Sequence, residues 1–248
     1  QELGKGAQGV VFKATRRADR LPCAVKQVFL RSMSRREQDL AAHEVNVLAK
    51  LDHPHVIRYL DSFMHGSTLH IVTELAEGGN LHERLRKVGG GKKLPERQVW
   101  KYFIQTALGL YHIHSKNILH RDVKYRPLNP KPYTKTLTVG DLGVAKVLDS
   151  SMDMAKTMVG TPYYLSPELC EGKAYNDRTD TWSLGCVLFE LCTLKHPFDG
   201  TNQAALILKI ICGKYPPLPR EYSPGLSAVL DACLLRDARR RPSSAALL

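Results

Sequence analysis

Residues 120–124 read His120-Arg121-Asp122-Val123-Lys124 and follow a long segment that starts at Pro95. The apolar residues of that segment recur at helical spacing, at Val99, Phe103, Leu110 and Ile113. This spacing predicts a helix with one buried face, so the string at 120–124 is expected on the loop that follows the helix. Asp122 is thereby predicted to lie on a loop beside a cleft.

A glycine-rich string lies far upstream, Gly4-Lys5-Gly6-Ala7-Gln8-Gly9-Val10-Val11. Glycine at this spacing lets the backbone approach phosphate oxygens closely and adopt unusual dihedral angles. Because Val10-Val11-Phe12 continues as a strand and no helix follows Gly9, a dinucleotide-binding loop is disfavoured. Lys26 lies 17 residues beyond Gly9 on the next predicted strand. Its ammonium group is expected to reach the α- and β-phosphates of a nucleotide.

One helix is predicted within this strand-rich region. The sequence Ser34-Arg35-Arg36-Glu37 has the spacing of a capping box. The apolar residues that follow at helical spacing are Leu40, Val47, Leu48 and Leu51. Glu44 lies on this helix, and an ion pair between Glu44 and Lys26 would hold the lysine against the phosphates.

Three residues in the second half of the chain are candidates for the phosphate chemistry itself. Asp122 is expected to orient a substrate hydroxyl, since phosphoryl transfer needs correct aim more than proton abstraction. Lys124 would neutralise charge that develops on the γ-phosphate. Asp141 begins Asp141-Leu142-Gly143 after a strand-like run, and its hard carboxylate oxygen suits Mg²⁺.

The hydrophobic periodicity changes near residue 80. Before it, strands are predicted at 10–14, 23–29, 56–64 and 68–75. After it, helices are predicted from Pro95, over 181–192 and over 204–212. The fold class is therefore expected to be α+β and bilobal. A small β-rich N-lobe, about 1–76, would hold the single helix, and a larger helical C-lobe would cover about 77–248.

Composition excludes several classes of protein. The chain has 248 residues, 43% hydrophobic and 24% charged, which is typical of a globular domain. No run reaches 18 apolar residues and no leader segment precedes a cleavage site, so an intracellular protein with no membrane association is expected. The six cysteines form no C-x-x-C pair, and Cys186 and Cys192 are expected to be buried free thiols. The chain is expected to be a single domain truncated at both ends.

The formal net charge of +12 raises the question of nucleic-acid binding. The basic residues are scattered along the chain, and none is interleaved with aromatic residues as a base-stacking surface requires. Nucleic acid is therefore not an expected partner. A phosphate-handling cleft or acidic partners account for the excess charge equally well.

The whole chain resembles a eukaryotic protein kinase domain. Residues 155–168, Ala-Lys-Thr-Met-Val-Gly-Thr-Pro-Tyr-Tyr-Leu-Ser-Pro-Glu, are similar to the activation segment of the NIMA-related (NEK) serine/threonine kinases, and residues 184–196 are similarly NEK-like. The resemblance implies an enzyme that transfers the γ-phosphoryl group of ATP to Ser or Thr hydroxyls of protein substrates, with Mg²⁺. It also implies activation by an upstream kinase or by autophosphorylation, and a cytoplasmic location with cytoskeletal or nuclear association as alternatives.

The same resemblance assigns further residues. It adds Leu3, Val11 and Ala24 to the ATP site, with Thr73 at the back of the pocket and Glu74 to Ala76 as the adenine-facing hinge. Structural roles are implied for three residues: Asp180 as a buried anchor of the catalytic loop, and Arg241 as the partner of Glu168. Lys124 and Thr161 mark hydroxyl substrates other than tyrosine, and Thr157 and Thr161 are the implied regulatory residues.

One position departs from the family pattern. The family has Asn, a ligand of the second Mg²⁺, five residues after the catalytic Asp, whereas this chain has Pro127 there. Proline has no side-chain oxygen, so either Asn129 takes over the role through a bulge or the second metal site is impaired. A sequence error in this stretch is a third possibility. An active enzyme is favoured, with a nucleotide-binding pseudokinase scaffold as the alternative. The prolines at 127, 130 and 132 are also expected to suppress the short strand that follows.

Overall fold

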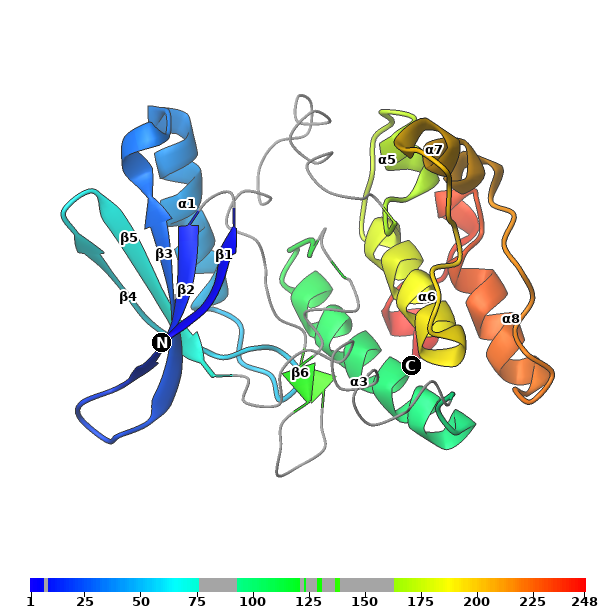
Figure 1. Cartoon of the computed structure of the whole chain (residues 1–248), viewed down its shortest axis with the longest axis horizontal. Helices are drawn as coiled ribbons and strands as arrows, with labels where there is room; N and C mark the ends of the chain where they lie inside the picture. The colour runs from blue at the N-terminus through cyan, green and yellow to red at the C-terminus, as the bar shows by residue number, and fades with distance from the viewer. Residues whose placement is uncertain (7–8, 76–92, 121–122, 124–128, 131–136, 139–162) are drawn as a thin grey trace.

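The computed structural model of the chain describes residues 1–6, 9–75, 93–120, 123, 129–130, 137–138 and 163–248 (Figure 1). A sheet with one long helix forms one side of the molecule, and a group of helices forms the other (Figure 1). The predicted α+β class with a small β-rich part and a larger helical part is confirmed. Among the described residues, no helix combines the length and the apolar character needed to cross a membrane.

The sheet is antiparallel and has the strand order β1-β2-β3-β5-β4. Its strands are β1 (Glu2–Gly6), β2 (Gly9–Thr15), β3 (Pro22–Phe29), β4 (Tyr59–His65) and β5 (Thr68–Glu74). The strands predicted at 10–14, 23–29 and 68–75 are confirmed, while β1 was not predicted. The strand predicted from Val56 begins three residues later, at Tyr59; Val56 makes only an isolated bridge, and its amide donates to His53 O in a turn.

Helix α1 (Arg35–Leu48) packs on this sheet. The shared core contains the buried side chains of Val28, Ala41, Leu69 and Ile71. The C-terminal end of α1 and the residues after it belong to a second core, since Val47 and Leu51 are buried with residues of the helical part. The predicted apolar face of α1 thus joins the two halves of the molecule.

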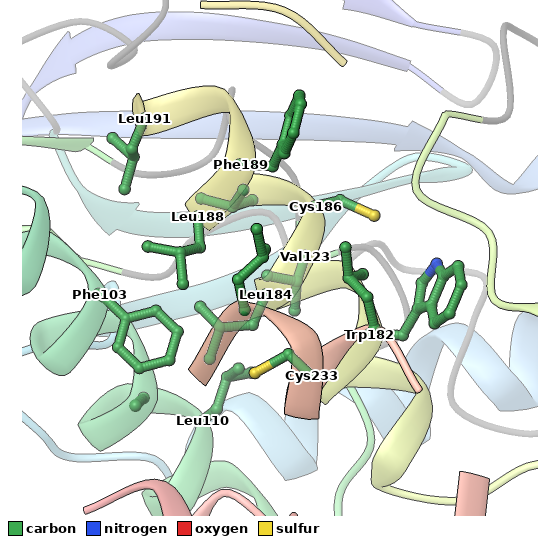
Figure 2. Close-up of a cluster of buried hydrophobic side chains, with 14 of the residues drawn as sticks. Phe103, Leu110, Val123, Trp182, Leu184, Cys186, Leu188, Phe189, Leu191 and Cys233 are labelled. Atoms are coloured by element: carbon green, nitrogen blue, oxygen red, sulfur yellow. The ribbon is translucent and has the colours of Figure 1, made fainter. Parts of the chain in front are cut away.

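The helical part is built around α6 (Arg178–Thr193), whose residues from Thr179 to Cys192 are all buried. The surrounding helices are α3 (Glu96–Ser115), α5 (Pro167–Cys170), α7 (Gln203–Cys212) and α8 (Pro224–Cys233), with short 3₁₀ turns at Ala238–Arg240 and Ala245–Leu247. A further 3₁₀ turn, Leu30–Ser32, follows β3 in the sheet half. Figure 2 shows side chains of α3, α6 and α8 meeting in this core. A helix that is buried all round is expected in the centre of a bundle, which is where α6 lies.

Two details of this core bear on the sequence predictions. Cys186 and Cys192 are free and buried, as predicted, and burial raises the pKa of the Cys192 thiol to about 12. Gly185 allows α8 to approach α6 closely, because a Cβ atom at this position would lie 2.8 Å from Cys233 Cβ. The predicted apolar face of α3 is also confirmed, since its four named positions are at most 1% exposed.

The expectation that prolines suppress the strand after residue 127 was wrong. Strand β6 (Asn129–Pro130) pairs antiparallel with β7 (Leu137–Thr138), with Asn129 opposite Thr138 and Pro130 opposite Leu137. Both strands of a two-stranded sheet are edge strands, and an edge strand tolerates proline because its amide position can face away from the partner. The pairing is correspondingly short.

Candidate active site

The glycine-rich string forms the end of the β1–β2 hairpin. Gly6 pairs with Gly9 across the hairpin, and β2 continues from Gly9 without a helix, as predicted. A Cβ atom on Gly9 would lie 1.7 Å from the backbone oxygen of Gln27 on β3. By contrast, a Cβ atom on Gly4 would have no heavy atom of another residue within 4 Å. The structure therefore requires glycine at position 9 for packing against β3, but has room for a methyl group at position 4.

We expect Gly9→Ala to lower the free energy of unfolding by about 1–3 kcal/mol, since the added methyl group overpacks the β2–β3 contact. Gly4→Ala is the matched control and should leave stability close to that of the parent. Urea-induced unfolding of the two variants, measured side by side, tests the contrast. Equal stabilities of the Gly4 and Gly9 variants would contradict the packing argument.

The strand register brings part of the predicted nucleotide site together. Val11 lies opposite Lys26, and Ala24 lies opposite Thr73. Directly opposite residues and residues two apart share a face of the sheet. Four predicted site residues therefore share one face: Val11, Ala24, Lys26 and Thr73. Leu3 is exposed on β1, next to a register shift between Glu2 and Gly4.

Glu74 is the last residue of β5, and the described part of the N-terminal half ends at Leu75. Its backbone amide donates to Arg58 O at 2.9 Å, and its carboxylate accepts from the Arg58 amide at 3.2 Å. These bonds hold the residue that begins the predicted adenine-facing hinge against the segment before β4.

A buried carboxylate anchors the backbone directly before Arg121-Asp122. Asp180 Oδ2 accepts a hydrogen bond from the His120 amide at 2.8 Å and lies 2.8 Å from His114 Nε2. Asp180 and His120 are each 1% exposed. Burial alone would raise the pKa of Asp180, but the hydrogen bond from His114 and the neighbouring His120 hold it below its ordinary value. This geometry agrees with the anchoring role implied for Asp180.

His114 extends the anchor to the C-terminal end of the chain. Its other ring nitrogen, Nδ1, lies 2.8 Å from Ser244 Oγ, so the histidine bridges Asp180 and Ser244. Ser244 is 3% exposed. Neither His114 nor Ser244 was singled out from the sequence. The one signal in the sequence was a histidine in the last turn of the predicted helix, directly after the apolar Ile113.

The second buried network joins Glu168 on α5 to Arg241. The guanidinium donates two parallel hydrogen bonds, from Nη1 to Oε1 and from Nη2 to Oε2, each 2.7 Å long. Thr179 Oγ1 also donates to Glu168 Oε1 at 2.8 Å. Burial would raise the pKa of Glu168, but Arg241 and Thr179 hold the pKa of that carboxyl below its ordinary value. The structure thus contains the Glu168–Arg241 contact that the resemblance implied.

Arg241 is held by more than its carboxylate partner. Its guanidinium donates to the backbone oxygens of Leu235, Arg178 and Arg236. It also lies over the Trp182 ring, with 4.9 Å between the guanidinium carbon and the ring centroid. The residue is 1% exposed, so its charge is compensated entirely within the protein.

Comparison with known proteins identifies the class of site. The family model described as "Protein kinase domain" matches residues 1–248. The chain belongs to the protein kinase domain family. A solved structure similar to this kinase domain, described as the crystal structure of Rad53 1-466 in complex with AMP-PNP, has a TM-score of 0.84 at 26% identity. That match covers 99% of this chain and 62% of the Rad53 chain.

The predicted resemblance to NEK kinases is also confirmed. The kinase domain is 41% identical over 250 residues to serine/threonine-protein kinase Nek1 of Mus musculus, covering 100% of this chain and 20% of that protein. It is 40% identical over 246 residues to Nek5 of Homo sapiens, covering 99% of this chain and 35% of that protein. The chain thus spans about a fifth to a third of the length of these two relatives.

Several predicted site residues of the kinase domain lie outside the described residues: Ala76, Asp122, Lys124, Asp141, Thr157 and Thr161. For Glu44 on α1 and Asn129 on β6 the backbone is described and the side chain is not. Within the described part of the chain, no group of three or more His, Cys, Asp or Glu side chains could hold a metal ion. The described residues therefore include the shared sheet face, the first two residues of the predicted hinge, and the buried contacts of Asp180 and of Glu168 with Arg241.

Proposed function

We propose that this domain is an ATP-dependent protein serine/threonine kinase of the NEK type. The observation that carries the proposal is the buried Asp180 anchor, which fixes the His120 backbone directly before Arg121-Asp122. The similarity of about 40% to proteins named serine/threonine-protein kinases supports the choice of substrate class. The proposed unit is one catalytic domain over 1–248, with an N-lobe at about 1–76 and a C-lobe at about 77–248.

Each proposed role follows from the chemistry of phosphoryl transfer. Val11 and Ala24 would pack against the adenine, and Lys26 would bind the α- and β-phosphates of ATP from the same face of the sheet. Asp122 would orient the substrate hydroxyl, and Lys124 would neutralise charge developing on the γ-phosphate. The proposed position of Asp122 is supported by its flanking residues in the sequence, His120 and Val123, which are each 1% exposed.

The donor set partly fits Mg²⁺. Asp141 has a hard carboxylate oxygen, whereas Pro127 has no side-chain oxygen to offer. Asn129 is the proposed replacement. It pairs with Thr138 in the β6–β7 ladder, and Asp141 follows Thr138 by three residues, which span at most about 11 Å of chain. Mg²⁺, when bound, would neutralise the phosphate oxygens of ATP.

We expect Asp122→Ala to lower kcat for phosphoryl transfer by about a hundredfold or more, since the hydroxyl loses the group that aims it. The measurement is transfer of radiolabelled γ-phosphate from ATP to a generic protein substrate, with parent and variant at equal concentration and matched thermal stability. Equal signal from the two proteins would reject the enzyme. Nucleotide binding without transfer by the parent would favour the pseudokinase scaffold, which the Pro127 departure supports.

We expect Asn129→Ala to lower kcat about tenfold, equivalent to about 1.4 kcal/mol of transition-state stabilisation, and to raise the Mg²⁺ concentration needed for half-maximal rate. Asn46→Ala is the control, because Asn46 is an exposed residue on α1. Initial rates across a Mg²⁺ titration distinguish the two variants. If Asn129→Ala and Asn46→Ala both behave like the parent, Asn129 is not a metal ligand.

A further inference from the structure

Two consecutive tyrosines begin the described chain after residue 162, and both contact His196. The ring of Tyr163 stacks on the imidazole, with centroids 3.8 Å apart and an interplanar angle of 8°. Tyr164 meets the same imidazole edge-on, at 5.9 Å and 88°. His196 comes from the segment that follows α6, so the contacts join parts of the chain that are distant in sequence.

The same residues compensate a buried carboxylate. Glu190, in the last turn of α6, is 4% exposed. The hydroxyl of Tyr164 lies 3.1 Å from Oε1 and 2.9 Å from Oε2 of this carboxylate, and His196 Nδ1 contacts Oε1. A buried carboxylate needs polar partners that replace its lost hydration. The Tyr164 hydroxyl supplies the hydrogen bonds, and the His196 ring contacts the same carboxylate. We call Tyr163, Tyr164, Glu190 and His196 the Tyr–His–Glu cluster.

The turn that follows α6 fixes the position of the His196 backbone. Leu194 ends α6 with a φ of 59°, in the left-handed region that is unfavourable for a leucine, and its amide donates to Glu190 O at 2.8 Å. This reversal brings the chain back over the last turn of the helix. On the other side of His196, Pro197 and Phe198 are buried, and Phe198 stacks on Trp182.

The Tyr164 backbone is held by the same helix. Ser183 Oγ on α6 donates to Tyr164 O at 3.0 Å. Tyr164 is therefore attached to α6 by its carbonyl oxygen and by its hydroxyl, while Tyr163 is attached through the stack on His196. Removing the imidazole would leave Tyr163 without this stack and Glu190 with one fewer polar contact.

We propose that His196 is a positioning residue for the protein substrate, acting through Tyr163 and Tyr164. The inference rests on the proposed function, and on the implication of the NEK resemblance that Thr161, two residues before Tyr163, marks a hydroxyl substrate. The contacts of the cluster run to α6 and the segment after it, whereas the proposed nucleotide residues lie on β2, β3 and β5. His196 therefore affects the binding of peptide and leaves the binding of ATP unchanged.

Three variants of His196 separate its stack on Tyr163 from its contact with Glu190. His196→Ala removes both the ring and the donor. His196→Phe keeps a flat ring to stack on Tyr163 but has no donor for Glu190, and His196→Asn keeps an amide donor at the place of Nδ1 but has no ring. Lys195→Ala is the matched control in the same turn, because the contacts of Lys195 with Thr193 run through its backbone.

The first measurement is steady-state kinetics with a serine peptide. For His196→Ala we expect the KM for peptide to rise about tenfold, equivalent to about 1.4 kcal/mol, with the KM for ATP unchanged. The Phe and Asn variants should each recover part of the loss, and Lys195→Ala should match the parent. A parental KM for peptide in His196→Ala, a parallel rise in the KM for ATP, or full recovery by one replacement alone would overturn the proposal.

The second measurement needs no catalytic activity. Amide hydrogen exchange of residues 163–169 should be at least about tenfold faster in His196→Ala than in the parent, with the sheet strands unchanged, because local opening is governed by local contacts. Parental exchange in this segment, or faster exchange everywhere, would contradict a positioning role. If the parent transfers no phosphate, the proposed function fails, and hydrogen exchange still decides whether His196 positions the tyrosines.

Discussion

Arg241→Ala is expected to lower the free energy of unfolding by about 3–5 kcal/mol, the usual loss when one partner of a buried ion pair is removed. The variant leaves the Glu168 carboxylate, 6% exposed, with Thr179 as its remaining side-chain donor among the described contacts. It also removes the donor from three backbone oxygens and the cation above the Trp182 ring. Urea-induced unfolding followed by circular dichroism gives the measurement.

Arg239→Ala is the matched control for this prediction. Arg239 lies two residues away, is exposed, and pairs with Asp237, which is also exposed, so its removal should change stability little. Similar losses of stability in the Arg239 and Arg241 variants would show that burial of the pair is not what matters.

The Glu168–Arg241 pair should also make stability depend on pH in the acid range. The pKa of Glu168 is lower in the folded protein than its ordinary value of about 4.3. The pair therefore stabilises the fold fully above that ordinary value, and the contribution is lost as the pH falls through the folded-state pKa. In Arg241→Ala this part of the acid destabilisation should disappear, which urea unfolding at several pH values below 5 would detect.

Asp180→Ala is the second variant with a large expected effect. The substitution removes Asp180 Oδ2, the oxygen that contacts both the buried His120 amide and His114 Nε2. Each unsatisfied buried group costs about 1–3 kcal/mol, so a loss of about 2–5 kcal/mol is expected. Because Asp122 follows His120 by two residues, kcat should also fall at least about tenfold at a temperature where the variant is folded.

Asp177→Ala controls for removal of a carboxylate from the same helix end. Asp177 precedes α6, makes no side-chain capping bond there, and lies 3.5 Å from Arg178 Nε. Unfolding in urea and phosphoryl transfer are measured on both variants. A stable Asp180→Ala protein with parental kcat would mean that the catalytic loop holds its conformation without this anchor.

The arrangement of secondary structure was largely predictable because the signals are local. The long apolar periodicities over α3, α6 and α7 indicated helices, and short runs rich in β-forming residues indicated β2, β3 and β5. Strand β1 was missed because its five residues, Glu2–Gly6, alternate weakly and acquire their strand geometry by pairing with β2. Helix α8 was missed although Ser223 caps it, accepting from the Leu226 amide.

Motif order was enough to indicate a kinase-like protein, and the resemblance to that family then implied the roles of Glu168, Asp180 and Arg241. The contacts that complete the site could not be read in this way. Ser244 reaches His114 across 130 residues, and His196 meets Glu190 and Tyr163 only after α6 ends in a left-handed turn. Local sequence specifies the conformation of a segment, whereas the distances between side chains on different segments arise when the core around α6 packs them together.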